Sequence, residues 1–193
     1  MIVHEILSYE LHFSSYFSTN EQQNQQILFN NDSCNQSYLN GVEPLFHNGC
    51  DFGNLNIPQV SIILGNIYTE GQYRTRDINK AIHYFSLAAD QNHINAQFCL
   101  GTIYYSNEYI TRDINKAIHY FSLAADQKYL NAQFILGIIY YTGEYIKRDI
   151  NKAHYYLSQV ANQNYPDAQI ILANIYYTGE YITPNINKSI FYL

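Results

Sequence analysis

The sequence has no tryptophan, one methionine, three cysteines and few charges, since Asp, Glu, Lys and Arg make up only 13% of its 193 residues. Lys and Arg number 10 against 16 Asp and Glu, and this acidic balance argues against the basic surface that non-specific nucleic-acid binding requires. No apolar run approaches the ~20 residues of a membrane-spanning helix, and the first residues lack the positive charge of a secretory signal. We therefore predict a soluble, cytoplasmic protein with no nucleic-acid partner and no direct membrane insertion.

Apolar residues are abundant, at 47%, and include 21 Tyr and 10 Phe, so a tyrosine-rich core is expected. The first 57 residues form a leader of different character, with six acidic residues, no Lys or Arg, and therefore the whole net charge of −6. Its Asn/Gln-rich run at 20–26 predicts partial disorder. Near its start, apolar residues at helical spacing predict one amphipathic helix that docks on the protein's own core, namely Val3, Ile6, Leu7, Phe13 and Phe17.

After residue 57 the sequence repeats with a period of 36 residues. Residues 76–91 recur identically at 112–127, and a divergent version occupies 148–163. A period in this range is typical of an array in which each unit is one supersecondary element stacked on its neighbours. Four copies follow in register, at 58–94, 95–130, 131–166 and, shortened, 167–193.

Each copy is predicted to form two helices. The first has one apolar face, which in the second copy consists of Ala96, Leu100, Ile103 and Tyr104. The second helix begins at an aspartate, whose carboxylate can accept the free amides of the first turn. These helix starts are Asp77, Asp113 and Asp149, and the stripe expected to be buried in the first copy is Ile78, Ala81, Ile82, Phe85, Ala88 and Ala89.

A glycine recurs within the first helix, at Gly65, Gly101 and Gly137. Because glycine inside a helix is ~1 kcal/mol less favourable than alanine, its return at one position predicts close helix packing that a larger side chain would obstruct.

At the start of the second helix, Arg76, Asp77 and Lys80 are expected to form, with their copies, a solvated series of helix caps and weak surface ion pairs.

The combined pattern is Leu64-Gly65-x-x-Tyr68-x-x-Gly71, followed by Asp77-x-x-Lys80-Ala81-x-x-Tyr84-Phe85-x-x-Ala88-Ala89. It resembles the Sel-1-like repeat, a longer relative of the tetratricopeptide repeat, and it recurs in every copy over 58–193. The resemblance implies an all-α fold, a right-handed α-solenoid of stacked antiparallel helix pairs.

The sequence departs from that pattern at several glycine positions. A tyrosine replaces the second loop glycine, at Tyr73, Tyr109, Tyr145 and Tyr181, Asn107 replaces the first loop glycine of copy two, and Ala173 replaces the helix glycine of copy four. The glycine expected after the second helix is Asn92, Lys128 or Asn164. Asparagine tolerates the left-handed backbone expected there, and lysine does so less well, so the turn at Lys128 is the least expected of the three.

No catalytic, cofactor-binding or metal site is predicted. Asp51-Phe52-Gly53 matches a kinase triplet but lacks the rest of a kinase, so we interpret it as a turn. Cys34, His47, Cys50 and Asp51 fit no common zinc spacing. Cys99 takes the position of an isoleucine and is expected to be buried, whereas His83 and His119 are expected at the surface or in the groove. A single cysteine within the repeats also argues against the disulfide-stapled arrays of some secreted relatives.

The concave face of such an array is lined by the first helices and commonly binds extended peptides or partner helices. Positions 102, 138 and 174 vary most in chemistry, as expected if each meets a different part of a ligand. Alternatively, the aromatic residues at 98, 105, 134 and 141 fill the core or the groove. The partner-binding residues predicted from helical phase are Phe98, Thr102, Tyr105, Phe134, Ile138, Tyr141, Asn174 and Tyr177.

The resemblance implies a non-enzymatic protein–protein interaction scaffold or adaptor that binds a protein or peptide and needs no cofactor. Because some relatives were described as hydrolases, an enzyme is the alternative, but it would require a Ser, Cys or His network in the leader, and the sequence offers none. The fourth copy stops at Leu193, the position of Phe85 and Leu157. We expect either a fragment of a longer array or an apolar C-terminal end that self-associates.

Overall fold

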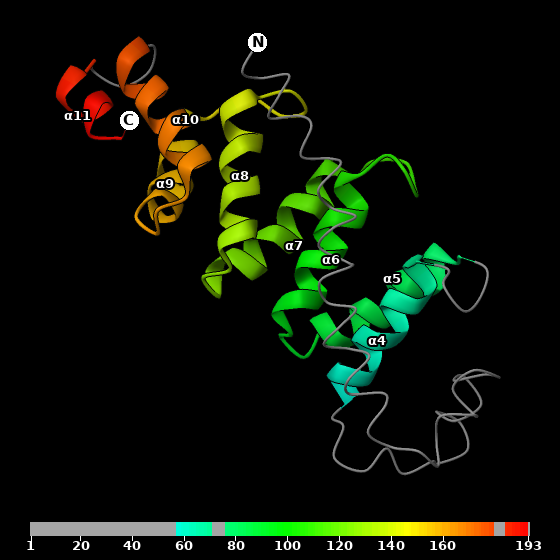
Figure 1. Ribbon diagram of the computed structural model, residues 1–193. Coiled ribbons are helices and arrows are strands. Elements are labelled where there is room, and N and C mark those ends of the chain that lie inside the picture. Colours follow the sequence, from blue (N-terminus) through cyan, green and yellow to red (C-terminus); the bar gives the residue numbers. More distant parts are fainter. Residues whose placement is uncertain (1–56, 71–75, 180–183, 193) are drawn as a thin grey trace, which may run out of the picture. The chain divides into compact units, whose positions relative to one another are not determined.

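The structure, a computed structural model, describes residues 57–70, 76–179 and 184–192, and the regular elements in these ranges are all α-helices (Figure 1). The chain divides into two compact units, one that ends at Ala96 and one over Gln97–Leu193, and each is described by itself. The predicted helix over residues 3–17 and the partial disorder predicted for the leader lie outside the described residues.

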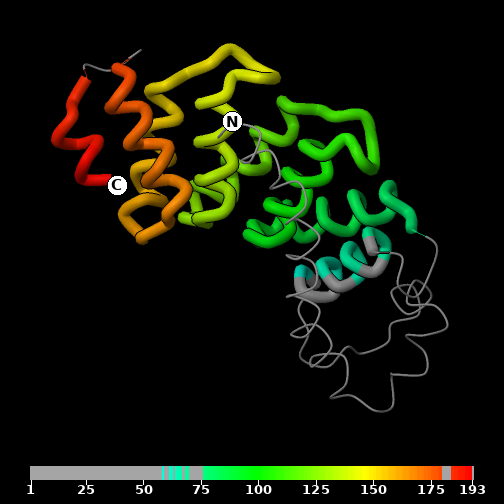
Figure 2. Tube along the Cα trace, turned by 45° about the horizontal axis from the view of Figure 1, so that its top comes forward, coloured from blue at the N-terminus to red at the C-terminus, as the bar shows by residue number. Residues whose placement is uncertain are grey.

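The helices follow one another in pairs, which the continuous tube of Figure 2 shows in chain order. In the first unit α4 packs on α5, and in the second α8 packs on α9 and α10 on α11. Contacts of α7 with α8 and of α9 with α10 stack successive pairs. The helix bounds are α4 (Ile57–Glu70), α5 (Ile78–Ala89), α6 (Ile94–Tyr105), α7 (Ile114–Asp126), α8 (Leu130–Thr142), α9 (Ile150–Ala161), α10 (Pro166–Thr178) and α11 (Ile186–Phe191), with α6 crossing the boundary between the units.

The two helices of a pair run antiparallel. In the pair of α6 and α7, Tyr104 stacks on Tyr120 near the connecting loop. At the far end of the same pair, the Gln127 Nε2 donates a hydrogen bond of 2.8 Å to the Gln97 Oε1. The described residues therefore confirm the predicted all-α fold of stacked antiparallel helix pairs.

Each second helix begins at a side-chain cap. Asp77, Asp113 and Asp149 accept a hydrogen bond of 3.0–3.1 Å from the amide three residues later, as predicted. Asn185 does the same at the start of α11 with 2.9 Å. The backbone amides of these four cap residues also donate to the carbonyl of a tyrosine near the end of the preceding helix. This hydrogen bond ties the start of the second helix to the end of the first helix of the same pair.

The connection between pairs is a left-handed turn. Asn92, Lys128 and Asn164 have φ values of 60°, 64° and 59°, so lysine adopts the conformation despite its side chain. After α7, the Lys128 amide donates to the Ala125 carbonyl and the Tyr129 amide to the Ala124 carbonyl. These two bonds form a Schellman motif, which satisfies carbonyls that would otherwise be left open at the helix end.

The core lies between the helices of each pair and between stacked pairs. In α6, the first helix of the second pair, Ala96, Leu100 and Ile103 are fully buried, as predicted. In α5, the second helix of the first pair, Phe85 is fully buried as well. Ile78 and Ile82, which were expected in the buried stripe, are only half-buried. An added Cβ at Gly65 would lie 2.5 Å from the Phe85 ring, which confirms that the recurrent glycine marks close helix packing.

Candidate functional site

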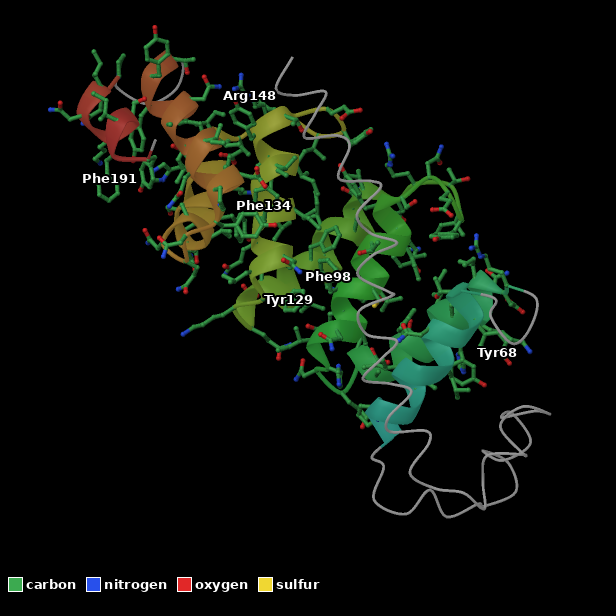
Figure 3. All side chains as sticks on the ribbon, in the orientation of Figure 1. Tyr68, Phe98, Tyr129, Phe134, Arg148 and Phe191 are labelled. Carbon is green, nitrogen blue, oxygen red and sulfur yellow. The ribbon has the colours of Figure 1, made fainter. Side chains whose placement is uncertain are left out.

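Three of the eight predicted partner-binding residues, Phe98, Thr102 and Phe134, are buried, so their side chains do not reach the surface. Phe98 packs on Tyr129, which directly precedes α8, at a ring-centroid distance of 5.0 Å (Figure 3). Phe134 packs on Tyr165 at 4.7 Å in the same way. The first helices are therefore covered by the connection to the next pair as well as by their own second helix. The alternative assignment as core residues is confirmed for both phenylalanines.

Thr102 is also buried, and its hydroxyl has a hydrogen-bond partner within its own helix. Its hydroxyl donates a hydrogen bond of 3.0 Å to the Phe98 carbonyl, one turn earlier in α6, and so satisfies itself within the helix. A threonine bonded in this way needs no outside partner, and it offers no donor to a ligand.

The other five predicted residues reach the surface at the C-terminal ends of the first helices. We call these five residues the tyrosine surface: Tyr105, Ile138 and Tyr141, which are half-buried, and Asn174 and Tyr177, which are exposed. All five belong to the second unit. Tyr177 shows 71% of its surface, far more than its counterparts Tyr105 and Tyr141.

An arginine holds the first part of this surface. The guanidinium of Arg112 lies 5.4 Å from the ring centroid of Tyr105 and 4.2 Å from that of Tyr145. Its Nε also donates to the Tyr105 carbonyl at 2.5 Å. Because Tyr105 belongs to one helix pair and Tyr145 to the next, this cation–π contact joins two pairs at the edge of the surface.

The environment of Tyr145 keeps its phenol neutral. Burial, together with a hydrogen bond to Glu144, raises the pKa of Tyr145 above its ordinary value of 10.0, although the charge of Arg112 acts in the opposite direction. At neutral pH the Tyr145 ring is therefore uncharged.

A second arginine and an asparagine hold the middle of the surface. Arg148 lies over the ring of Tyr141 at 5.2 Å from the centroid. The Tyr141 hydroxyl accepts a hydrogen bond of 2.6 Å from the Asn174 amide nitrogen, which belongs to the following pair. Both tyrosines that are half-buried in the surface are therefore fixed in place, while Tyr177 projects from the end of α10.

A second recurrent arrangement was not predicted from the sequence. In every pair, a tyrosine of the first helix stacks on a tyrosine of the second with ring planes within 5° of parallel, and a lysine from the second helix lies over the first ring. The lysine nitrogens lie 4.8–5.2 Å from the ring centroids. The lysines expected to serve only in solvated surface pairs thus also pack on aromatic rings. The four sets are Tyr68, Lys80 and Tyr84; Tyr104, Lys116 and Tyr120; Tyr140, Lys152 and Tyr156; and Tyr176, Lys188 and Tyr192.

The described residues contain no group of three His, Cys, Asp or Glu side chains placed to hold a metal ion. His83 and His119 are exposed, each edge-on to the tyrosine that follows it, and Cys99 is buried, as expected for all three. The kinase-like triplet at 51–53 and the cluster of Cys34, His47, Cys50 and Asp51 lie outside the described residues. Within the described part, no helix is both long and apolar enough to span a bilayer.

Comparison with known proteins agrees with the repeat pattern. The family model of the Sel1 repeat matches residues 62–93, 94–129, 130–165 and 166–193. No curated protein matches the chain. Among solved structures, a Sel1 repeat protein from Oxalobacter formigenes is 30% identical with a TM-score of 0.64, over 70% of this chain and 39% of that one.

A protective antigen of uropathogenic Escherichia coli with an SLR fold is 24% identical with a TM-score of 0.64, over 72% of this chain and 32% of that one. The likeness to this antigen shows the fold alone, and the chain spans less than two fifths of the length of either solved protein. With four successive repeats matched over most of its length, the chain belongs to the Sel1 repeat family.

Proposed function

We propose that this protein is a non-enzymatic scaffold that binds an extended peptide of a partner protein across the tyrosine surface. Sel1 repeat proteins generally act as protein-interaction scaffolds, and the repeats make up most of this chain. The observation that carries the proposal is the exposed ring of Tyr177 at the end of α10, together with the Tyr141 hydroxyl, which the Asn174 amide holds in place.

The chemistry of the surface supports this role. Tyrosine is enriched at protein interfaces because its large ring contributes apolar contact area while its hydroxyl forms hydrogen bonds. Rings that are held by arginine or asparagine before binding lose little conformational freedom when a ligand arrives, so more of the contact energy becomes affinity. The residue three positions before the surface tyrosine changes from Ile138 in α8 to Asn174 in α10, which gives successive positions along a peptide different neighbours.

Peptides selected from a random display library on the full-length protein would test the proposal. Their affinity would be measured by fluorescence anisotropy for the wild type, for Tyr177→Ala, and for the Tyr105/Tyr141/Tyr177→Ala triple variant. Loss of an aromatic anchor in the centre of an interface changes affinity by about 2 kcal/mol or more, so we expect at least a tenfold weaker affinity for Tyr177→Ala.

Tyr155 provides the matched control. It is an exposed tyrosine on α9, a second helix, and lies outside the tyrosine surface. Tyr155→Ala should leave the affinity of the selected peptides unchanged. Equal affinities for the wild type and the triple variant, with intact helical circular dichroism, would contradict the proposal.

A further inference from the structure

The junction between the third and fourth helix pairs holds a histidine where the other copies have isoleucine. His154 of α9 is half-buried, and its Nε2 lies 2.6 Å from the Tyr176 hydroxyl of α10, with the two rings edge-to-face. Tyr176 is only 5% exposed. At the position of His154, α7 has Ile118, which is half-buried and cannot bind a proton. Of α7 and α9, only α9 therefore places an ionisable side chain at this position.

The surroundings of His154 favour its neutral form. The groups that act on it from other helices are the Tyr176 hydroxyl of α10 and the charge of Lys188 of α11. Burial, followed by this like charge, lowers the pKa of His154 below the ordinary value of 6.5. Within the described residues, no carboxylate contributes to that shift. A proton on His154 is therefore a positive charge that no neighbouring negative charge offsets.

The charge of Lys188 is itself a particular feature of the fourth pair. In the two preceding pairs, the equivalent lysine lies 3.5 or 4.0 Å from the aspartate that caps its helix. These ion pairs are Lys116 with Asp113 and Lys152 with Asp149. The cap of α11 is Asn185, a neutral residue that brings no carboxylate to Lys188. The charge of Lys188 therefore acts on His154 without that compensation.

The other ionisable groups at α9 act on different residues. From α8, Tyr140 stacks on Tyr156 with ring planes 4° apart, and Lys152 of α9 lies over the Tyr140 ring. Burial raises the pKa of Tyr156, and the charge of Asp126 from α7 adds to this effect. In the described part of the chain, neither α7 nor α8 therefore supplies His154 with a negative charge.

We infer that protonation of His154 opens the junction between the third and fourth pairs. Opening solvates the imidazolium and removes it from Lys188, so the open form binds the proton more readily than the closed form. Acid therefore shifts the population toward the open form. One interface of a repeat array can open while the others persist, because stability is approximately a sum of repeat and interface contributions. The opening does not depend on the proposed peptide binding.

Amide hydrogen exchange of the full-length protein, corrected for the intrinsic exchange rates, would test this inference. Between about pH 7.5 and about pH 5, the protection of amides in α10 and α11 should fall, and that of amides in α6 and α7 should fall less. Because one proton is bound, the fall should not exceed about tenfold per pH unit. An NMR titration of the histidine ring protons should place the pKa of His154 below 6.5.

Two conservative variants separate the switch from a general effect of acid. His154→Ile introduces the residue of the other copies, and the protection of its α10 and α11 should not change with pH. Asn185→Asp keeps a capping side chain and places a carboxylate beside Lys188, so the loss of protection should be smaller than in the wild type. His119→Ile is the matched control at an exposed histidine of α7, and it should behave like the wild type.

The following results would each overturn the inference. One is a pKa of His154 at or above 6.5, and another is constant protection of α10 and α11 across this pH range. An undiminished loss of protection in His154→Ile or in Asn185→Asp would also contradict it. The same holds for an equal loss in α6 and α7, which would show that acid unfolds the second unit as a whole.

Discussion

Replacement of Gly101 by alanine would test the close packing between the helices of a pair. An ideal Cβ at this position lies 2.6 Å from Cδ1, 2.7 Å from Cε1 and 3.0 Å from Cγ of Phe121. The Phe121 ring is fully buried and packs on Phe98 at 5.6 Å, so it has no free space into which to move. The added methyl group must therefore push α6 and α7 apart or force the ring from its rotamer.

Two opposing effects set the magnitude. In an exposed helix, replacing glycine by alanine stabilises the chain by ~1 kcal/mol because alanine loses less backbone entropy on folding. Overpacking a close-packed core is destabilising by ~1–3 kcal/mol, and three ring atoms at or below 3.0 Å place Gly101→Ala near the upper value. The free energy of unfolding should therefore fall by about 2 kcal/mol, opposite in sign to the helix-propensity effect.

Urea unfolding followed by circular dichroism and by tyrosine fluorescence would measure this difference, with coincident curves as the check for two-state behaviour. The Phe121→Ala background supplies the control, because removal of the ring leaves only the propensity effect. There, Gly101→Ala should stabilise the chain by ~1 kcal/mol. If Gly101→Ala stabilises the otherwise wild-type chain, the two helices do not approach as closely as the contact requires.

Three further substitutions have expected outcomes that the same urea assay can check. Lys128→Asn should stabilise the chain by about 0.5–1 kcal/mol because asparagine tolerates the left-handed turn better, and no gain would contradict the role given to that turn. Asp113→Ala should destabilise it by about 1 kcal/mol through loss of the cap to the Lys116 amide, and an unchanged midpoint would contradict this. Burial, aided by the charge of Lys188, lowers the pKa of His154 below its ordinary 6.5, so the unfolded chain binds the proton more readily and stability is lost as the pH falls from 6.5 through the folded pKa. His154→Ile, which introduces the residue of the other copies, should flatten this dependence below about pH 6.5, and an unchanged slope there would argue against it.

The sequence was sufficient to predict the features that depend on neighbouring residues. A cap such as Asp113 acts on an amide three residues away, and the left-handed turns at Asn92 and Asn164 follow from a single side chain. The close contact at Gly101 was also predictable, because a costly residue recurs where two amphipathic helices must meet. The fold class follows from these local features together with the period of the repeat.

The exposure of the residues on the first helices was less predictable, because helical phase describes one helix and ignores what packs on it. Phe98 and Phe134 lie on the expected side of their helices, but Tyr129 and Tyr165 of the connecting turns cover them. The stacked tyrosines with their lysines were missed for a similar reason. Their spacing is visible in every copy, yet nothing in one helix shows that the two rings lie parallel across the pair.

The contacts between successive pairs are partly shared and partly unique. At both junctions of the second unit, a glutamine of the first helix donates 3.3 Å to an alanine carbonyl of the preceding pair, as Gln133 to Ala125 and Gln169 to Ala161. Because such shared contacts involve residues that recur in the copies, they would form equally well between any two pairs. They contribute to cohesion and do not determine the order of the pairs.

The order must therefore come from contacts that differ between junctions. The bond of His154 to Tyr176, which joins the third pair to the fourth, is such a contact, because the other copies have isoleucine at the position of His154. Since residues 76–91 and 112–127 are identical, the second helices of the first two pairs cannot distinguish their neighbours, and the first helices and the loops must do so. These are also the segments that carry the tyrosine surface. We therefore expect substitutions there to alter stacking order and partner binding together, and substitutions within the identical segments to alter stability alone.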